Sequence, residues 1–479
     1  MKTNSLDFDA RALREKILDL AMRGKLVKQD PNDEPASVLL EKIKAEKAEL
    51  VKEGKIKKSK SLPEVTDEEK PFDIPDSWEW VRLGDIFSIN DRNKATDDMI
   101  VGFLPMKNIK DGYENSFTIE EKSWGKVRKG YTHIQVGDIA LSKITPCFQN
   151  RKSCIITDLP NNIGAATTEI YALYPLIRTF SSLYIYFLKS KMFIEEGTKN
   201  FTGNVGQQRV PKKFVENFVI PLPPLSEQSR IAAKIAQLFA LLRKVESSTQ
   251  QYAKLQTLLK SKVLDLAMRG KLVEQDPNDE PASVLLEKIK AEKEQLIKEK
   301  KIKKSKPLPP ISDEEKTFEI PDSWEWVRLG DIGEIFAGGD KPKTFSKTKD
   351  KYHTVPIYSN GIENKGLYGF TDKARVYDPA ITLSARGTIG HVEYRKKPYL
   401  PIIRLISFVP YNEKCLNCIF YFLQSEILIE KGDGSSIPQL TVPKLKPKLI
   451  PFPPLSEQKR ISAKVAQLFA LLRKDESSN

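Results

Sequence analysis

The sequence is poor in the residues that build disulfide frameworks, metal sites and acid–base pairs. Its 479 residues include 4 cysteines and 3 histidines, His133, His353 and His391. So few cysteines in so long a chain make no disulfide framework, which fits a reducing cytoplasm. The histidines are scattered along the chain, so a nucleophile–base pair has little to draw on.

Long apolar runs and nucleotide-binding loops are missing as well. No uninterrupted apolar stretch reaches the length of a membrane span. The first sixteen residues, MKTNSLDFDARALREK, alternate charges around no apolar core, so we expect neither a signal peptide nor a membrane anchor. No G-x-x-x-x-G-K-[ST] loop is present. These absences favour a cytoplasmic protein without a catalytic site of its own.

One spacing, Cys415-x-x-Cys418, could suggest a metal. It has no second ligand pair nearby, and it stands at the entry of an apolar helix beside Leu416 and Ile419. A structural zinc site needs four ligands. We therefore interpret the two cysteines as buried structural thiols and expect no metal site and no cofactor site.

Positive charge is what the chain has in excess. Lys and Arg number 78 against 64 Asp and Glu, a formal net charge of +14. Hydrophobic residues make up 40% and charged residues 30%, which is typical of a folded soluble protein. A basic excess favours a polyanionic partner such as nucleic acid, because each neutralised phosphate releases counterions. A basic protein without such a partner is the alternative on charge alone.

The main feature of the sequence is an internal repeat. Residues 18–47 recur at 264–293 with one change, Lys28 to Glu274, and IPDSWEWVRLGDI recurs at the same offset of 246. A second block, 220–244, recurs at 450–474 with four changes, at an offset of 230. Between these blocks the sequences have diverged almost completely. We call the repeated blocks the frame and the divergent residues 87–219 and 333–449 the inserts. A constant frame with varied inserts predicts a scaffold that presents two different recognition surfaces, whereas simple drift after a duplication would change frame and inserts equally.

The repeat is also circular. When the ends are aligned to the central segment, Asn479 falls on Thr249 and Met1 falls on Ser247. The two terminal pieces therefore make up one more copy of the central element, and we expect the termini to lie close together.

The central element is predicted to be one long helix. From Ser226 to about Gly270 it contains no internal Pro or Gly, which gives a length of about 64 Å. Apolar residues follow coiled-coil spacing, and the ESSTQQ stretch at 246–251 interrupts it. The expected seam is Ile231, Ile235, Leu238, Leu242 and Val245, then Tyr252, Leu255 and Leu259. Its expected partner is the split helix formed by the two terminal pieces, running antiparallel.

Each insert combines short β-rich runs with a closing apolar helix, at 182–197 and at 417–432. Two further helices are expected at Asp33–Glu53 and Asp279–Glu299. The predicted fold class is α+β, with two globular α+β domains separated by long helices that form an antiparallel coiled coil in a circular pseudo-two-fold repeat. The expected segments are N-terminal conserved helices (1–53), a basic, Pro-containing linker (54–71), a first domain (72–225), a central long helix with a following helix (226–299), a second linker (300–317), a second domain (318–455) and a C-terminal helix (456–479).

The loops of both inserts are rich in side chains that read DNA bases. Arg pairs with guanine and Asn or Gln with adenine, each through two hydrogen bonds. The DNA-binding candidates in the first insert are Lys107, Asn108, Lys143, Arg151, Lys152, Asn204, Gln207, Gln208 and Arg209. Those in the second insert are Lys341, Lys343, Ser359, Asn360, Arg386, Thr388 and Gln439.

Several motifs together point to a known family. They are the paired PLPPLSEQ and PFPPLSEQ segments, the repeated LDLAMRGKLV, the two SWEWVRLGDI openings and, inside the inserts, PMKNIKDGY, SKITPC, YSNGIENKGLYG and SARGTIG. Over essentially the whole chain, their order resembles the specificity subunit of type I restriction–modification systems. That resemblance implies two target recognition domains, each reading one half of a bipartite asymmetric site in double-stranded DNA across an unread spacer.

The resemblance also implies partners. The helices would dock two modification subunits, which methylate adenine with S-adenosylmethionine, and a restriction (motor–nuclease) subunit would join for cleavage. S-adenosylmethionine, ATP and Mg²⁺ are then expected on the partner subunits only. The alternative is a coiled-coil scaffold that docks proteins without reading sequence, which would explain the helices but not the basic, divergent loops.

Overall fold

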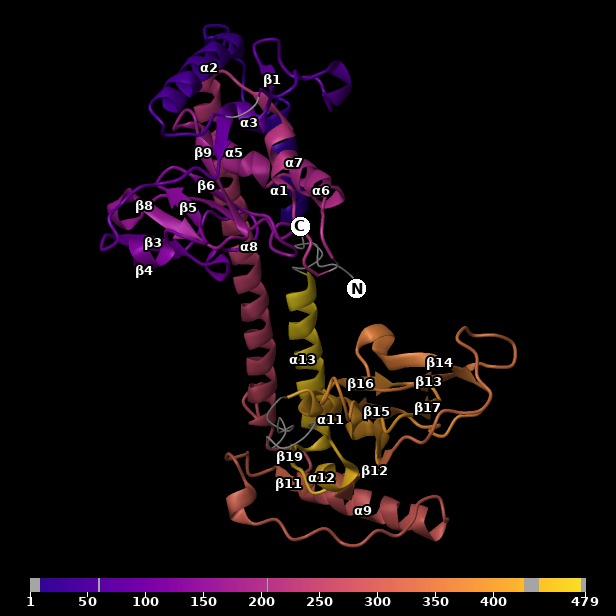
Figure 1. Ribbon diagram of the computed structural model, residues 1–479. Helices are drawn as coiled ribbons and strands as arrows, with labels where there is room; N and C mark the ends of the chain where they lie inside the picture. Colours follow the sequence, from indigo (N-terminus) through magenta and orange to yellow (C-terminus); the bar gives the residue numbers. More distant parts are fainter. Residues whose placement is uncertain (1–8, 59–60, 205, 426–438, 475–479) are drawn as a thin grey trace. The chain divides into compact units, whose positions relative to one another are not determined.

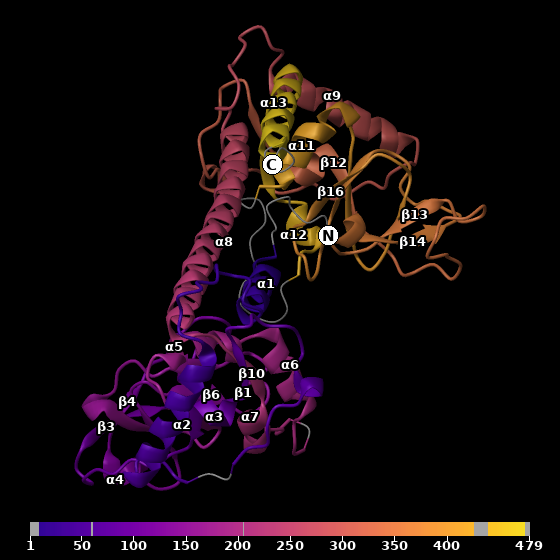
Figure 2. The same ribbon diagram turned by 90° about the horizontal axis from the view of Figure 1, so that it is seen from above.

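The computed structural model describes residues 9–58, 61–204, 206–425 and 439–474. The chain divides into two compact units, an N-terminal unit of residues 9–247 and a C-terminal unit described from residue 248 to 474. Each unit holds one copy of the frame and one insert (Figures 1 and 2). The helix α8 (Leu225–Met268) contributes residues to both units, which confirms the predicted central helix. The predicted closeness of the termini concerns residues outside the described ranges.

In the N-terminal unit, α1 (Ala10–Met22) lies antiparallel to the first part of α8. Arg14, near the start of α1, forms an ion pair of 2.5 Å with Glu246. Gln29, beyond the end of α1, donates to Glu227 at the start of α8. The direction of α1 is therefore opposite to that of α8, as the split-helix prediction requires.

In the C-terminal unit, α13 (Leu455–Lys474) plays the same part for the rest of α8 (Figure 1). The Nε2 of Gln256 donates to the carbonyl of Leu472 at 3.1 Å. Further along α8, Leu264 shares an apolar core with Ile461 near the start of α13. The α1 and α13 pieces thus each pack on a different part of the one long helix, which confirms the antiparallel pairing.

The helix seam follows the prediction only in its first part. Ile231 and Ile235 are fully buried, but Phe239 follows them in place of Leu238, which is only half-buried. Tyr113 and Tyr186 of the first insert pack edge-on against the Phe239 ring, each with centroids 5.6 Å away. Residues of the first insert, as well as α1, therefore pack on this side of α8. The buried residues Ile231, Ile235 and Phe239 follow one another at intervals of four rather than at the alternating intervals of a heptad. Three of the other predicted seam residues are largely exposed: Val245, Leu255 and Leu259.

A two-stranded ribbon closes the base of each insert. In the N-terminal unit, β1 (Glu79–Arg82) pairs antiparallel with β10 (Val219–Leu222). In the C-terminal unit, β11 (Glu325–Arg328) pairs with β19 (Leu449–Phe452) in the same register. The first strand of each ribbon comes from the SWEWVR segment before the insert. The second comes from the IPLPP or IPFPP segment after it. The frame thus holds both ends of each insert, so the residues between them can vary.

The two inserts share a topology although their sequences differ. Each contains a four-stranded sheet with corresponding strand order, β2-β9-β6-β7 in the first and β12-β18-β15-β16 in the second. Each also has a second sheet, β4-β3-β8-β5 or β14-β13-β17. The strands of the first insert are β2 Phe87–Ile89, β3 Ile100–Leu104, β4 Glu120–Ser123, β5 Thr132–Gln135, β6 Ile139–Ser142, β7 Ser153–Ile155, β8 Ile163–Ala166 and β9 Ile170–Pro175. Those of the second insert are β12 Gly333–Ala337, β13 Val355–Tyr358, β14 Leu367–Thr371, β15 Ala380–Leu383, β16 Val392–Arg395, β17 Leu400–Pro401 and β18 Ile406–Pro410.

The closing helix of the first insert is two helices rather than one. α5 (Phe180–Leu188) ends before Ser190, whose extended backbone and Oγ cap the first turn of α6 (Lys191–Lys199). In the second insert α11 (Leu416–Leu423) is described, and residues 426–438 lie outside the described ranges. The remaining α-helices are α2 Ala36–Lys52, α3 Leu83–Ile86, α4 Trp124–Val127, α7 Lys212–Asn217, α9 Ala282–Lys298, α10 Leu329–Ile332 and α12 Val442–Leu445.

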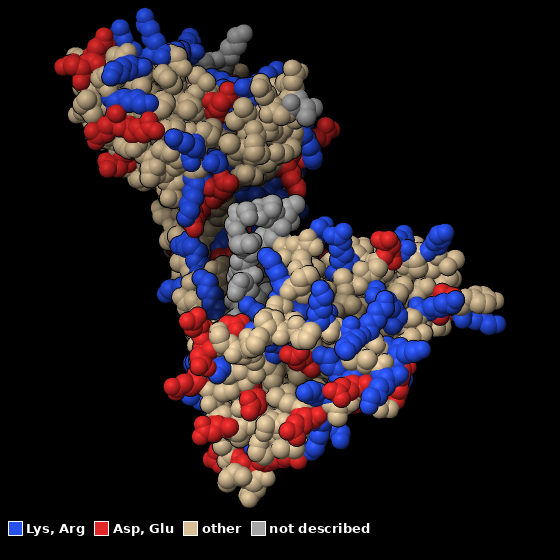
Figure 3. Space-filling view, turned by 90° about the horizontal axis from the view of Figure 1, so that it is seen from below, with Lys and Arg blue, Asp and Glu red and all other residues tan. Residues whose placement is uncertain are grey.

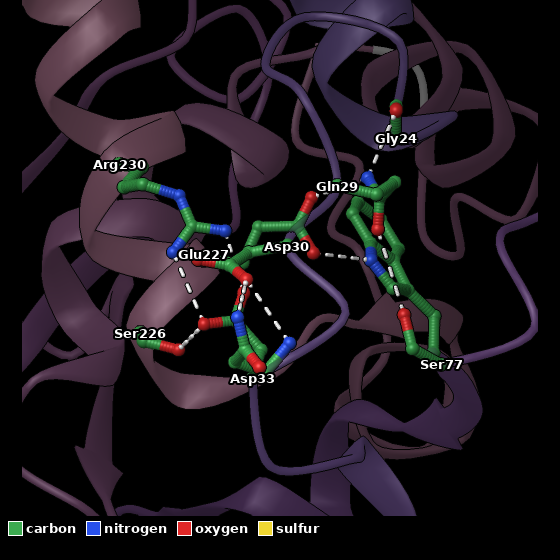
Figure 4. A network of polar contacts seen from close by, with 10 residues as sticks. Gly24, Gln29, Asp30, Asp33, Ser77, Ser226, Glu227 and Arg230 are labelled. Atoms are coloured by element: carbon green, nitrogen blue, oxygen red, sulfur yellow. Dashed lines mark hydrogen bonds and ion pairs between the residues drawn. The ribbon is translucent and has the colours of Figure 1, made fainter.

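A buried carboxylate at the start of α8 joins three segments of the frame (Figure 4). The Oε2 of Glu227 accepts from the indole Nε1 of Trp78 at 2.8 Å, and its Oε1 accepts from Gln29 at 2.6 Å. Beside it, Asp33 accepts from Ser226 and forms an ion pair with Arg230, both at 2.5 Å. Burial raises the pKa of Glu227, while the bonds from Trp78 and Gln29 oppose that rise.

The C-terminal unit repeats this junction. Glu457 at the start of α13 accepts from the indole of Trp324 at 2.8 Å and from Gln275 at 2.6 Å. Arg460 forms an ion pair with Asp279 at 2.6 Å. The SEQ, QDPND and SWEW motifs therefore recur together because they meet in one buried polar cluster, where each member satisfies another.

We expect Trp78→Phe to lower the free energy of unfolding of the N-terminal unit by about 1–3 kcal/mol, because it leaves a buried carboxylate oxygen without its donor. Trp324→Phe is expected to have a similar effect on the C-terminal unit. Trp80→Phe is the matched control, since within the described residues its indole nitrogen makes no hydrogen bond. Thermal unfolding by calorimetry measures all three. Equal losses in Trp78→Phe and Trp80→Phe would contradict the role given to the Glu227 junction.

Candidate nucleic-acid interface

The net positive charge of the chain comes almost entirely from its inserts. Residues 87–219 and 333–449 together hold 36 Lys and Arg against 24 Asp and Glu. The remaining frame holds 42 against 40 and is close to neutral. Lys and Arg are dense on the face seen in Figure 3, with acidic side chains among them. Attraction to a polyanion therefore belongs to the variable parts.

In the first insert, the loops after β6, before β9 and before α7 meet beside the end of β6. We call this place, and its equivalent in the second insert, the loop junction. The amide of Lys143 donates to the carbonyl of Glu169 at 3.0 Å, and the amide of Thr145 donates to the carbonyl of Gln208 at 3.0 Å. Arg209 bonds both carboxylate oxygens of Glu169, at 2.8 and 2.9 Å. The structure thus brings the candidates Lys143, Gln208 and Arg209 together. Glu169 joins them, a residue that the sequence analysis did not select because its contact partner is 40 residues away.

The charges at this junction influence one another. Partial burial lowers the pKa of Lys143, whose ammonium lies 5.0 Å from the centre of the Tyr171 ring. The bond from Arg209 lowers the pKa of Glu169. The carboxylate therefore stays ionised and fixes the plane of the guanidinium. A guanidinium fixed in this way loses little freedom when it binds a base edge or a phosphate.

The other candidates of the first insert lie on two stretches of surface. Asn204 and Gln207 are exposed in the loop that Thr202 and Arg209 close by mutual backbone hydrogen bonds. Lys152 contacts the carbonyl of Met106 and the carboxylate of Asp111, which puts it next to the exposed Lys107. The Nδ2 of Asn108 donates to the carbonyl of Thr118 at 3.1 Å.

Arg151 is a correction to the predicted set. Its side chain is buried, its Nε donates to the carbonyl of Lys189, and its Nη2 forms an ion pair with Glu15 of α1 at 2.5 Å. Tyr113 donates to the same Glu15 carboxylate. Arg151 therefore attaches the first insert to α1 rather than facing a ligand. Lys189 was not among the predicted residues; its ammonium donates to three backbone carbonyls, and burial lowers its pKa to about 8.

In the second insert, the structure pairs two candidates directly. The Nη2 of Arg386 donates to the Oε1 of Gln439 at 2.8 Å, and the adjacent amide of Leu440 donates to the carbonyl of Ala385. Both Arg386 and its neighbour Gly387 are exposed. Arg386 and Gln439 therefore form one polar surface, although they are far apart in the sequence.

Asn360 holds the neighbouring loops in place. Its Oδ1 accepts from the amide of Ala385 at 2.8 Å, and its Nδ2 donates to the carbonyl of Ile403 at 2.7 Å. The backbone of Ser359 bonds Gly366, and the hydroxyl of Thr388 is buried without a partner in the described residues. Asn360 thus positions the loop that carries Arg386.

Lys341 and Lys343 lie apart from the loop junction of the second insert, which Arg386, Gln439 and Asn360 form. The ammonium of Lys341 lies 4.0 Å from the centre of the Phe345 ring, and that of Lys347 lies 4.0 Å from the centre of the Tyr368 ring. The two rings are 5.6 Å apart. Lys343 is exposed beside them. The two rings and Lys347 were not among the predicted residues, because the pairing of a loop with its neighbouring hairpin cannot be read from the sequence.

The loop junctions of the two inserts occupy the same position in the shared topology. At the repeat offset of 230, Arg209 corresponds to Gln439. Each packs on the loop that follows the same strand of the sheet, β6 or β15. The frame therefore presents a differently composed polar surface at one fixed place in each insert, which suits the reading of two different sequences.

The two cysteines with metal-ligand spacing are buried thiols in the structure. No three His, Cys, Asp or Glu side chains among them converge on a possible metal site. Cys415 and Cys418 are free and buried, and burial raises the pKa of Cys415 to about 12. None of the described helices has both the length and the apolar composition to cross a membrane.

Comparison with known proteins agrees with this arrangement. The family model of the type I restriction modification DNA specificity domain matches residues 75–256 and 321–478. The chain is 39% identical to the type I restriction enzyme EcoAI specificity subunit of Escherichia coli, over 98% of this chain and 90% of that one. It is 45% identical to the EcoEI specificity subunit of the same organism, over 68% of this chain and 62% of that one.

The fold also matches a solved structure that describes the complex assembly and conformational transition of the type I R-M system. The TM-score is 0.57 at 19% identity, over 85% of this chain and 94% of that one. The two family matches fall one on each repeat and together cover more than half of the residues. The chain therefore belongs to the family of type I restriction–modification specificity subunits.

Proposed function

We propose that this chain is the DNA-recognition subunit of a type I restriction–modification complex, in which each insert reads one half of a bipartite asymmetric site. The observation that carries the proposal is the matched pair of loop junctions. Two inserts of one topology present different Arg, Gln and Lys side chains at the same place, on a frame that is nearly neutral and nearly unchanged. Base readers that differ between half-sites need this combination.

The frame is proposed to dock two modification subunits. Exposed leucines recur in it at equivalent positions: Leu13 and Leu259 are 44% and 50% exposed, and Leu241 and Leu471 are 51% and 54% exposed. All four lie on the paired helices α1, α8 and α13. An exposed apolar side chain is ordinary when it occurs once, but a matched set in two repeats suits two copies of one partner.

Catalysis is proposed to reside in the partner subunits. The cofactors expected there are S-adenosylmethionine for methylation and ATP with Mg²⁺ for the restriction subunit. The competing proposal is a docking scaffold that does not read sequence. It would account for the repeated leucines, but it gives no reason why the excess of positive charge lies almost entirely in the divergent inserts.

Mapping of methylated adenines tests the proposal. The chain would be co-expressed with its modification subunit in a host that lacks other adenine methylation. A single asymmetric motif with two short halves and a fixed gap is expected. An active modification subunit that methylates without any such motif would support the scaffold instead.

We expect Arg386→Ala to change recognition only in the half-site read by residues 318–455, at a cost of about 1–3 kcal/mol for the base it contacts. The matched variant is Arg209→Ala at the equivalent junction, which should affect only the other half-site. Binding of the assembled complex to oligonucleotides with single base changes measures both. Uniform weakening across all sequences by Arg386→Ala would identify a phosphate contact and contradict base reading.

The length of α8 is expected to set the length of the unread spacer. α8 runs unbroken through Ser247, where the two units meet in the sequence. Inserting four residues after Ser247 adds about 6 Å of helix and should lengthen the unread spacer by about 2 base pairs, with both half-sites unchanged. Ser247→Ala and Ser248→Ala together form the control of unchanged length. If the spacer in the methylated motif kept its length after the insertion, the length of α8 would not determine the length of the spacer.

A further inference from the structure

The second insert contains a turn whose backbone is unfavourable for its residues. Ile403 and Arg404, which follow β17, both adopt left-handed backbone angles, with φ of 50° and 58°. This region is uncommon for any residue with a side chain, and it is a true outlier for a β-branched one such as isoleucine. Glycine or asparagine would adopt it more easily.

The surrounding backbone holds the turn in this conformation. The amide of Ile403 donates to the carbonyl of Gly339 at 2.9 Å, and its carbonyl accepts from Asn360 at 2.7 Å. The amide of Leu405 closes the turn on the carbonyl of Ile402 at 3.0 Å. The conformation is thus fixed from both sides, and the strain is part of the folded insert.

The side chain at the tip of the turn faces solvent. Ile403 is 52% exposed, and the next residue, Arg404, is exposed as well. An isoleucine held in this way carries both backbone strain and exposed apolar surface. Exposure of one apolar side chain is ordinary by itself, but here it coincides with backbone strain that the insert does not relieve, and strain of this kind gathers at ligand-binding sites.

The tip lies beside the candidate reading surface. Asn360 bonds the carbonyl of Ile403 with one end of its amide and the amide of Ala385 with the other. Ala385 precedes Arg386, which contacts Gln439. Ile403 and Arg404 are therefore positioned next to the surface proposed to read DNA.

The first insert differs at the equivalent turn. The amide of Thr167 bonds the carbonyl at the end of β3, as that of Ile402 bonds the end of β13, so Thr168 and Glu169 correspond to Ile403 and Arg404. Neither Thr168 nor Glu169 has a positive φ. Glu169 instead forms an ion pair with Arg209. The exposed apolar tip is therefore a property of the second insert.

We propose that Ile403 is a wedge that inserts between two stacked base pairs at the second half-site, while Arg404 contacts the adjacent phosphate. The inference rests on the proposed function of the chain in reading DNA. An apolar side chain on a rigid turn, flanked by a cation, is the combination with which DNA-bending proteins unstack a base step. The second half-site would then be read partly through the ease with which that step deforms.

The test uses the chain assembled with its modification subunits and an oligonucleotide carrying its mapped site. 2-Aminopurine, which fluoresces when unstacked, replaces single adenines across each half-site in turn. We expect enhanced fluorescence at one step of the second half-site. Ile403→Asn should abolish it and weaken binding about tenfold, because asparagine suits the turn but does not wedge. Ile403→Leu, which keeps an apolar tip, should retain both the fluorescence and most of the affinity.

Stability separates this role from a structural one. Ile403→Asn should leave the unfolding temperature of the free chain unchanged or raise it, since it relieves the backbone strain. Thr168→Asn in the first insert is the matched control and should leave fluorescence and affinity unchanged. Unchanged binding and fluorescence in Ile403→Asn would overturn the proposal that Ile403 is a wedge. Loss of assembly with the modification subunits would overturn it as well, because Ile403 would then contact a protein rather than DNA. A wild-type complex that shows no sequence preference would instead refute the proposed function itself.

Discussion

The hydrogen bonds from tryptophan and glutamine to a buried glutamate are the interaction on which the rest of the structure depends. Glu227 and Glu457 stand at the starts of α8 and α13, where they accept from Trp78 and Trp324. Each bond joins a long helix to the strand that opens an insert. A buried carboxylate without its donors is costly, so the cluster specifies one arrangement of three frame segments. That constraint explains why the frame changes so little between repeats.

Fixing the frame leaves the inserts free to vary. The ribbons β1–β10 and β11–β19 hold the two ends of each insert in the same register. Beyond the ribbons the inserts share a corresponding strand order and a closing apolar helix, while the side chains of their loops differ. The first insert presents Arg209 fixed by Glu169, whereas the second presents Arg386 bonded to Gln439. The same scaffold therefore supports two chemically different surfaces.

The sequence was enough to predict the features that repeat or follow helical spacing. The α8 helix, its antiparallel partners and the α+β inserts were all predicted, because Pro and Gly boundaries and a circular repeat are visible in the residues. Of the helix seam, Ile231 and Ile235 were predicted but Phe239 was not, since its contacts with the rings of Tyr113 and Tyr186 are long-range. Arg151 was misjudged for the same reason, because it forms an ion pair with Glu15 of α1, which is far away in the sequence. The strained turn at Ile403 depends on backbone angles that no local pattern indicates.

Exchange of inserts tests the central claim, that the inserts read and the frame only presents them. Residues 333–449 would be replaced by residues 87–219, and the methylated adenines would be mapped alongside the assembly of the complex. The account predicts a symmetric motif, in which the first half-site occurs twice as an inverted repeat. An assembled, active complex that still methylates the original asymmetric motif would contradict it.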